Sequence, residues 1–222
     1  MRAGEVIREA WELYRGHWRH LLPVAFVVFA LVSLFSLLLV ALLGPFGQFS
    51  AAFVLFAGVF WLQGALVLAV EDVRDGRADL SLRETLSRVR PRLNTLAVAG
   101  IGAAVVIAIG IVLLVVPGLV LATWWLVVVP VIMLEGRGVF GAFGRSRQLV
   151  RGHGWSAFGL FVLTALILIA ANLVLELALS PLEESVRRYA SDVLSNTLFA
   201  PFVALTFTLA YYRLRTLKAQ AP

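Results

Sequence analysis

Long runs of apolar residues, separated by short polar or charged segments, dominate the sequence. A helix needs about 20 residues to cross the hydrocarbon core of a bilayer, which is about 30 Å thick. The two central apolar runs are separated only by Pro117-Gly118, a pair typical of a tight turn. The two runs together are too long for a single bent span, so we place a reversal at this pair. We therefore predict six spans, at residues 21–43, 51–70, 95–116, 118–134, 155–179 and 193–211.

A second pattern precedes the first, third and fifth spans. In the first of these segments Val6, Ala10 and Tyr14 follow the spacing of one helix face, and arginines and glutamates occupy the opposite face. Such a helix is expected to lie in the membrane interface, with its apolar stripe at the boundary between headgroups and acyl chains. We predict three interfacial helices, at residues 3–19, 81–93 and 139–151.

The interfacial segments also resemble one another in sequence. Residues 7–9 (IRE) match residues 82–84 (LRE), and residues 13–17 (LYRGH) match residues 149–153 (LVRGH). These alignments predict a single 222-residue membrane domain built from three repeats, each an interfacial helix followed by a membrane hairpin. The alternative is that basic amphipathic segments ahead of membrane spans simply look alike. Each proposed repeat carries one arginine shortly before its first span, namely Arg15, Arg90 and Arg151.

Composition supports a membrane protein, and charge gives its orientation. Hydrophobic residues make up 61% of the chain and charged residues 14%, against about 45–50% and about 25% in soluble proteins. This balance excludes disordered chains, nucleic-acid-binding tails and ordinary soluble enzymes. In a six-span arrangement 17 of the 19 basic residues lie on one side, and only Arg187 and Arg188 lie on the other. By the positive-inside rule both termini are predicted to be cytoplasmic, so the net charge of +6 reflects topology rather than nucleic-acid binding.

Several short sequence motifs in the second half of the chain resemble those of a known family. They are residues 117–119 (PGL), residues 142–152 (AFGRSRQLVRG) and the closing residues 211–215 (YYRLR). They resemble the glycerophosphoryl diester phosphodiesterase membrane-domain family of multi-pass bacterial proteins. That family has an aspartate where this chain has Arg213, and often an arginine in the fourth span. The resemblance implies a bacterial plasma-membrane module without the catalytic barrel, for which the residues outside the spans leave no room.

No reactive centre stands out in the sequence. The chain has no cysteine, and its three histidines, His17, His20 and His153, suit interfacial packing better than a zinc site. We therefore predict neither a metal nor a cofactor. Asn172 and Glu176 lie one helical turn apart inside the fifth span. Polar groups at membrane depth are costly and often functional, although Glu176 could instead reach the interface or pair with Arg187 or Arg188.

These observations favour a non-enzymatic protein that organises the membrane or binds a partner. Anionic lipid headgroups are its expected ligands, and a membrane-protein partner or a second copy of the chain is also open. The residues expected to contact the headgroups are Arg15, Arg90, Arg145 and Arg151. The alternative is a transporter or lipid translocase with a polar path near Asn172 and Glu176. A membrane-embedded lipid enzyme is a third reading, for which clustered acids, histidines or metal ligands are too sparse.

Overall fold

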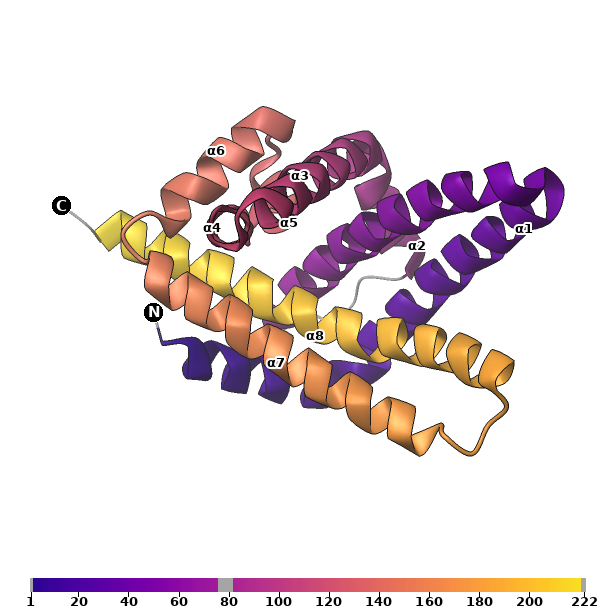
Figure 1. Cartoon of the computed structure of the whole chain (residues 1–222). Coiled ribbons are helices and arrows are strands. Elements are labelled where there is room, and N and C mark those ends of the chain that lie inside the picture. Colours follow the sequence, from indigo (N-terminus) through magenta and orange to yellow (C-terminus); the bar gives the residue numbers. More distant parts are fainter. Residues whose placement is uncertain (1, 76–81, 221–222) are drawn as a thin grey trace.

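The computed structural model describes residues 2–75 and 82–220, excluding the side chains of residues 37, 45, 48–57, 82, 185, 188, 189 and 192. Over this range the described secondary structure is helical (Figure 1). The first helix, α1 (Ala3–Arg74), is continuous except at two residues with non-helical backbone angles, His17 and Gly44. His17 marks the end of the amphipathic segment. Gly44, with φ of 56°, turns the chain back on itself, which a glycine does without steric cost.

The remaining elements form two further groups, each of which begins with a short helix. The second group begins after residues 76–81, where the start of the interfacial helix predicted from residue 81 lies outside the described residues. Its elements are α2 (Leu82–Val89), η1 (Arg90–Arg92), α3 (Leu93–Leu113), α4 (Val115–Trp124) and α5 (Val128–Glu135). The third group comprises α6 (Val139–Val150), α7 (Gly154–Ala178) and α8 (Glu184–Gln220), which continues as a helix through Pro201.

Several of these helices have the length and composition of membrane spans. Among the described residues, five qualify: Ala3–Gly44, Arg83–Leu113, Val115–Glu135, Gly154–Ala178 and Val193–Gln220. The predicted span at 51–70 lies within α1, but the side chains of its first seven residues lie outside the described part of the chain. The protein is therefore all-α over the described residues, with several helices long and apolar enough to cross a membrane.

The reversal between α3 and α4 differs from the prediction. The chain turns at Leu114, whose backbone is extended (φ −157°, ψ 120°), and not at Pro117-Gly118. Pro117 lies in the first turn of α4, where a missing N–H leaves no helical hydrogen bond unmade. Gly118 is needed for close approach instead: a Cβ at this position would lie 2.7 Å from the backbone nitrogen of Ile111. The two helices pack together directly across this glycine.

The predicted fourth span, 118–134, is not one continuous helix. It breaks between Trp124 and Val128, just before Pro130, which has no N–H to offer the carbonyl of Leu126. The prolines within the fourth and sixth spans predict kinks at Pro130 and Pro201. Ahead of Pro130 the helix gives way to turns at residues 125–127, where the Val128 N–H donates to the carbonyl of Trp125 at 3.1 Å. The short α5 that follows is buried at Val128 and at four consecutive residues from Pro130.

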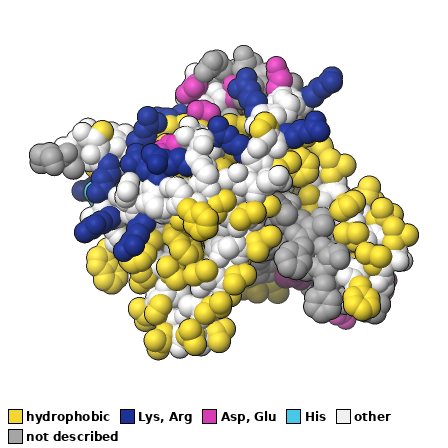
Figure 2. Space-filling view, turned by 90° about the horizontal axis from the view of Figure 1, so that it is seen from above, with side chains coloured by type: hydrophobic (Ala, Val, Ile, Leu, Met, Phe, Trp, Pro, Cys, Tyr) yellow, Lys and Arg dark blue, Asp and Glu magenta, His cyan; other side chains and the backbone are white. Residues whose placement is uncertain are grey.

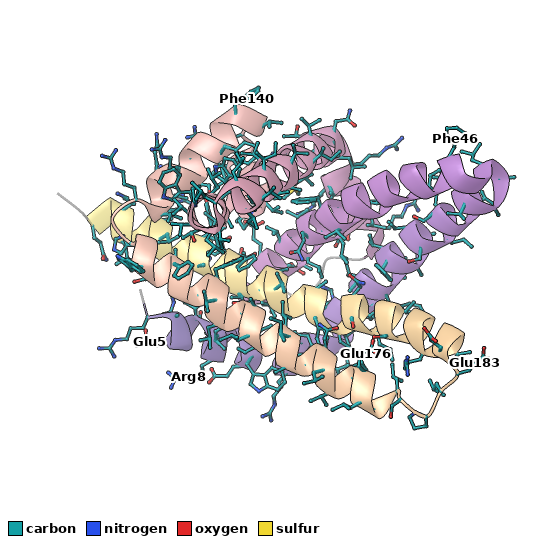
Figure 3. The ribbon with its side chains drawn as sticks, in the orientation of Figure 1. Glu5, Arg8, Phe46, Phe140, Glu176 and Glu183 are labelled. Carbon is teal, nitrogen blue, oxygen red and sulfur yellow. The ribbon has the colours of Figure 1, made fainter. Side chains whose placement is uncertain are left out.

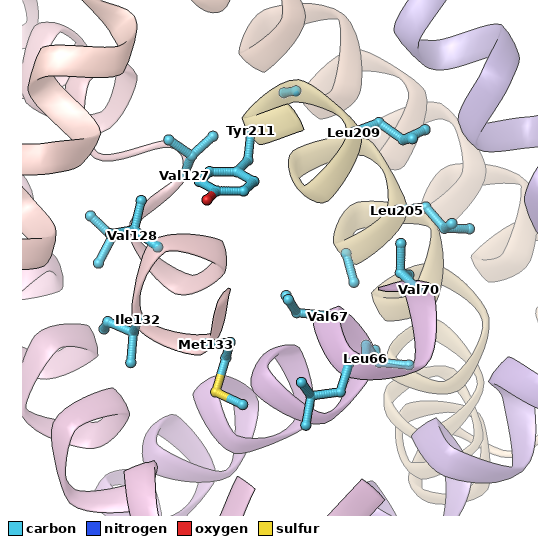
Figure 4. Close-up of a cluster of buried hydrophobic side chains, with 14 of the residues drawn as sticks. Leu66, Val67, Val70, Val127, Val128, Ile132, Met133, Leu205, Leu209 and Tyr211 are labelled. Atoms are coloured by element: carbon cyan, nitrogen blue, oxygen red, sulfur yellow. The ribbon is translucent and has the colours of Figure 1, made fainter. Parts of the chain in front are cut away.

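The apolar core lies at one end of the molecule. Both described ends of the chain lie at this end, whereas the turns of the α1 and α7–α8 hairpins lie at the other (Figure 1). Its largest buried side chain is Tyr211, which packs where α5, α8 and the last turns of α1 meet (Figure 4). At the hairpin tips large apolar residues are exposed. Phe46 is 82% exposed at the tip of α1 (Figure 3), and Val112 is 85% exposed at the end of α3. Exposed apolar surface on this scale suits contact with lipid rather than water.

Candidate functional site

Basic side chains gather over one side of the molecule, and hydrophobic side chains cover the lobes beside them (Figure 2). Three exposed arginines each lie close to the end of a short helical segment. Arg15 lies two residues before the break at His17, Arg90 begins η1 ahead of α3, and Arg151 follows the last residue of α6. Each marks the corner where a short helix gives way to a long apolar one. Within the described residues no acidic side chain forms an ion pair with any of the three.

The fourth predicted lipid-contact residue, Arg145, has a protein partner. Its Nε donates to both carboxylate oxygens of Glu135 at 3.1 Å. Glu135 also accepts from Arg137 Nε at 2.8 Å and from the buried hydroxyl of Tyr211 at 3.1 Å. A carboxylate at a helix C-terminus is disfavoured by the helix dipole, so the two guanidinium groups compensate for its position at the end of α5. We call Glu135, Arg137, Arg145 and Tyr211 the Glu135 cluster.

Three further hydrogen bonds hold the interrupted helix at its free carbonyls. Arg92 Nη1 donates to the carbonyls of Ile132 and Met133, the latter at 2.8 Å, in the last turn of α5. The Ser146 hydroxyl of α6 donates at 2.7 Å to the carbonyl of Trp124, where α4 ends. Helix ends leave such carbonyls without helical partners, and these side chains supply the missing donors. The helix α6 is thus fixed to the break through Ser146 and to α5 through Arg145.

The predicted interfacial helix at the N-terminus packs mainly on the protein. Val6 and Ala10 are fully buried, and Tyr14 donates a hydrogen bond of 3.0 Å to the carbonyl of Leu198 in α8. Arg213, which stands where the resembling family has an aspartate, pairs with Glu5 at 3.2 Å and Glu9 at 2.6 Å. These two ion pairs connect the end of α8 to the amphipathic segment.

Trp11 and Trp18 of the same helix remain half exposed, at 50% and 47%. Since indole rings favour the headgroup depth of a bilayer, these two side chains keep the position expected of interfacial anchors.

Asn172 and Glu176 lie between α7 and α8 near the turn that joins them, as Figure 3 shows for Glu176. The Oδ1 of Asn172 accepts from Ser195 at 2.7 Å, and the Oε1 of Glu176 accepts from Ser191 at 2.5 Å. Arg187 approaches Glu176 at 3.9 Å, and the side chain of Arg188 lies outside the described residues. Because the Glu176 side chain is 49% exposed, it reaches the surface and has a local counter-charge.

The histidines are dispersed. His17 Nδ1 lies 3.2 Å from the carbonyl of Leu13, and His20 lies 3.9 Å from the buried carboxylate of Asp72. Across residues 2–75 and 82–220 no group of three or more histidine, aspartate or glutamate side chains is placed to hold a metal ion. The polar side chains described above therefore form a charged, hydrogen-bonding surface, in which exposed arginines predominate.

Sequence reasoning did not anticipate the groups that join the helices. Tyr211, Ser146, Arg92 and Arg213 each form long-range polar contacts. Two sequence signals exist. Tyr211 is a hydroxyl-bearing side chain at the end of an apolar run, and Arg213 departs from the resembling family. Arg92 and Ser146 look like ordinary polar residues of interfacial segments, because their partners are distant in the sequence.

Comparisons with known proteins place the chain in a family but give no activity. Residues 84–214 match a family described as "Domain of unknown function (DUF7847)". No curated protein and no solved structure matches the chain. The matched description makes no reference to glycerophosphoryl diester phosphodiesterases, so the finer resemblance stays a prediction.

Proposed function

Since the chain belongs to the DUF7847 family, matched over more than half its length, we propose that it is a non-enzymatic multi-pass membrane protein that binds anionic lipid headgroups. Its role would be to organise the surrounding lipid or to present a basic surface to a membrane partner. The observation that carries the proposal is the equivalent placement of Arg15, Arg90 and Arg151, all exposed at the corners between short and long helices.

The proposed topology has six spans in three repeats, with both termini in the cytoplasm of a bacterial cell. The recurring order of a short helix followed by a hairpin supports the repeats, and the turn at Gly44 supports a hairpin within α1. The concentration of arginines at the end that holds both termini supports the orientation. In this arrangement the arginines face the leaflet richest in anionic lipid.

Electrostatics explains how such a surface would select lipids. Each basic residue near an anionic leaflet contributes about 1 kcal/mol of attraction, and a guanidinium matches a phosphate through paired N–H donors. Arg145 was predicted to share in this contact, and its bonds to Glu135 leave only part of its guanidinium for a lipid. The three exposed arginines are therefore the main proposed contacts.

Replacing all three arginines with glutamine tests the proposal. We expect Arg15→Gln/Arg90→Gln/Arg151→Gln to lower the preference for phosphatidylglycerol over phosphatidylcholine severalfold, because about 1 kcal/mol is lost at each site. The measurement is the lipid selectivity of the reconstituted protein, determined with spin-labelled lipids by electron paramagnetic resonance.

The matched control replaces the same three residues with lysine, which keeps the charge. It should retain most of the selectivity, and added salt should weaken the selectivity of the wild type. An unchanged preference for phosphatidylglycerol in the glutamine variant would contradict the proposal.

A lipid translocase or transporter is the second candidate, and the polar contacts between α7 and α8 favour it. Two neighbouring hydrogen bonds join these helices, one between Asn172 and Ser195 and one between Glu176 and Ser191. If they line a path, Glu176→Ala should reduce lipid scrambling or solute flux in proteoliposomes severalfold. The isosteric Glu176→Gln variant separates charge from shape. If wild-type vesicles show no activity above protein-free vesicles, this second candidate is wrong.

A further inference from the structure

An apolar groove runs between α4 and the beginning of α7. Its volume is about 510 Å³, within the range of about 300–1,000 Å³ that ligand pockets occupy. One wall is formed by Leu119, Val120 and Trp124, and the other by Gly154, Trp155 and Phe158. The groove separates the hairpin that contains α3 and α4 from the hairpin that contains α7 and α8, so no helix of the described chain fills it.

The interior of the groove offers an occupant almost no free polar group. The hydroxyl of Thr123, which contributes to the lining, already donates to the carbonyl of Leu119 at 2.8 Å. Trp155 is 88% exposed, which leaves its ring free to contact an occupant. An acyl chain matches these walls, whereas a sugar, peptide or nucleotide would lose its hydrogen bonds to water without replacing them.

Positive charge lies beside the groove. Gly152 contributes to the lining, and the residue before it is the exposed Arg151. The guanidinium carbon of Arg147 lies 4.3 Å from the centre of the Trp124 ring, which forms part of the wall. An apolar groove with arginines next to its lining residues is complementary to an amphiphile with one acyl chain in the groove and an anionic headgroup beside it.

We propose that the groove is a binding site for one anionic phospholipid, with an acyl chain along α4 and α7 and the phosphate at Arg151. This inference rests on the proposed function, since it assigns one lipid of the anionic class to a fixed place. Transfer from bilayer to groove removes no apolar surface from water, so the hydrophobic effect gives little selectivity. Selectivity therefore comes from the phosphate–guanidinium contact and from the fit of the chain between the tryptophans.

The glycines of α7 allow a blocking variant with a matched control. A Cβ at Gly154 or at Gly159 would meet no atom within 4 Å, so leucine is accommodated at either position without a clash at its Cβ. Only Gly154 lines the groove. Gly154→Leu should fill the groove, and Gly159→Leu makes the same change outside it on the same helix.

The experiment is native mass spectrometry of the full chain after extraction from vesicles of phosphatidylglycerol or phosphatidylcholine. We expect the wild type and Gly159→Leu to retain one phosphatidylglycerol molecule. Gly154→Leu and Arg151→Gln should each lower that occupancy about tenfold, the factor expected for loss of one charged contact or of the chain site. Thermal unfolding midpoints close to the wild-type value would show that both variants fold.

Two results would overturn the inference. One is wild-type occupancy by phosphatidylglycerol in Gly154→Leu, and the other is equal retention of phosphatidylcholine by the wild type. The spin-label experiment on the triple arginine variant keeps the two proposals apart. If that variant loses its lipid preference while Gly154→Leu keeps its bound lipid, headgroup binding stands and the groove site is wrong.

Discussion

Glu135→Ala should lower the free energy of unfolding by about 3 kcal/mol, because it leaves buried and partly buried donors of the Glu135 cluster without their acceptor. The carboxylate is only 14% exposed and joins three partners, Arg137, Arg145 and Tyr211. Its loss would release α6 from α5 and would remove the Glu135 acceptor of the Tyr211 hydroxyl. Unfolding by sodium dodecyl sulfate in mixed micelles, followed by circular dichroism, measures the change.

The control is the same substitution at a surface ion pair. Glu12 pairs with Arg8 at 3.9 Å, and its side chain is 70% exposed. Glu12→Ala should change stability by no more than about 0.5 kcal/mol, as is usual for exposed pairs. Equal effects at the two positions would show that the Glu135 cluster contributes nothing beyond an ordinary surface pair.

Gly118→Leu should destabilise the protein by about 3 kcal/mol, since overpacking at a tight contact forces backbone shifts. A Cβ at residue 118 would lie 2.4 Å from the Ile111 side chain and 2.7 Å from its backbone nitrogen. A side chain can change its rotamer, but the backbone of α3 must move away. The α3–α4 hairpin would therefore open, and a lower thermal unfolding midpoint in detergent would report it.

Gly102→Leu is the matched control on α3, because a Cβ there meets no atom within 4 Å. This variant should unfold near the wild-type midpoint, or slightly above it, since leucine is the better helix former. A wild-type midpoint for Gly118→Leu would mean that α3 and α4 do not pack across residue 118.

The membrane character of the fold could be predicted from local pattern. The predicted span at 155–179 corresponds closely to α7 (Gly154–Ala178), and the predicted interfacial helix at 139–151 corresponds closely to α6 (Val139–Val150). Such agreement is expected because a helix that faces lipid satisfies its own backbone hydrogen bonds and needs only length and apolar composition. The sequence also allowed the exposed positions of Arg15, Arg90 and Arg151 to be predicted.

The interior of the bundle was less predictable. The turn at Leu114 and the turns at residues 125–127 lie where helices meet through close glycine contacts and side-chain hydrogen bonds to carbonyls. Both sites lie in uniformly apolar sequence, where hydrophobic periodicity carries no information. Gly118 was read as a turn residue, and its actual role is close approach to Ile111.

Local sequence accounts for the several apolar helices, the short amphipathic helices beside them, and the arginines where the two kinds meet. These properties depend on composition and on spacing along one helix. Which charges pair inside the protein depends on how the helices pack. Arg145 is bound to Glu135 and Arg213 to Glu5 and Glu9, whereas Arg151 is left exposed beside the groove between α4 and α7. The physical reason is that an ion pair between residues distant in the sequence depends on how helices pack, and packing leaves no periodic signature in the chain.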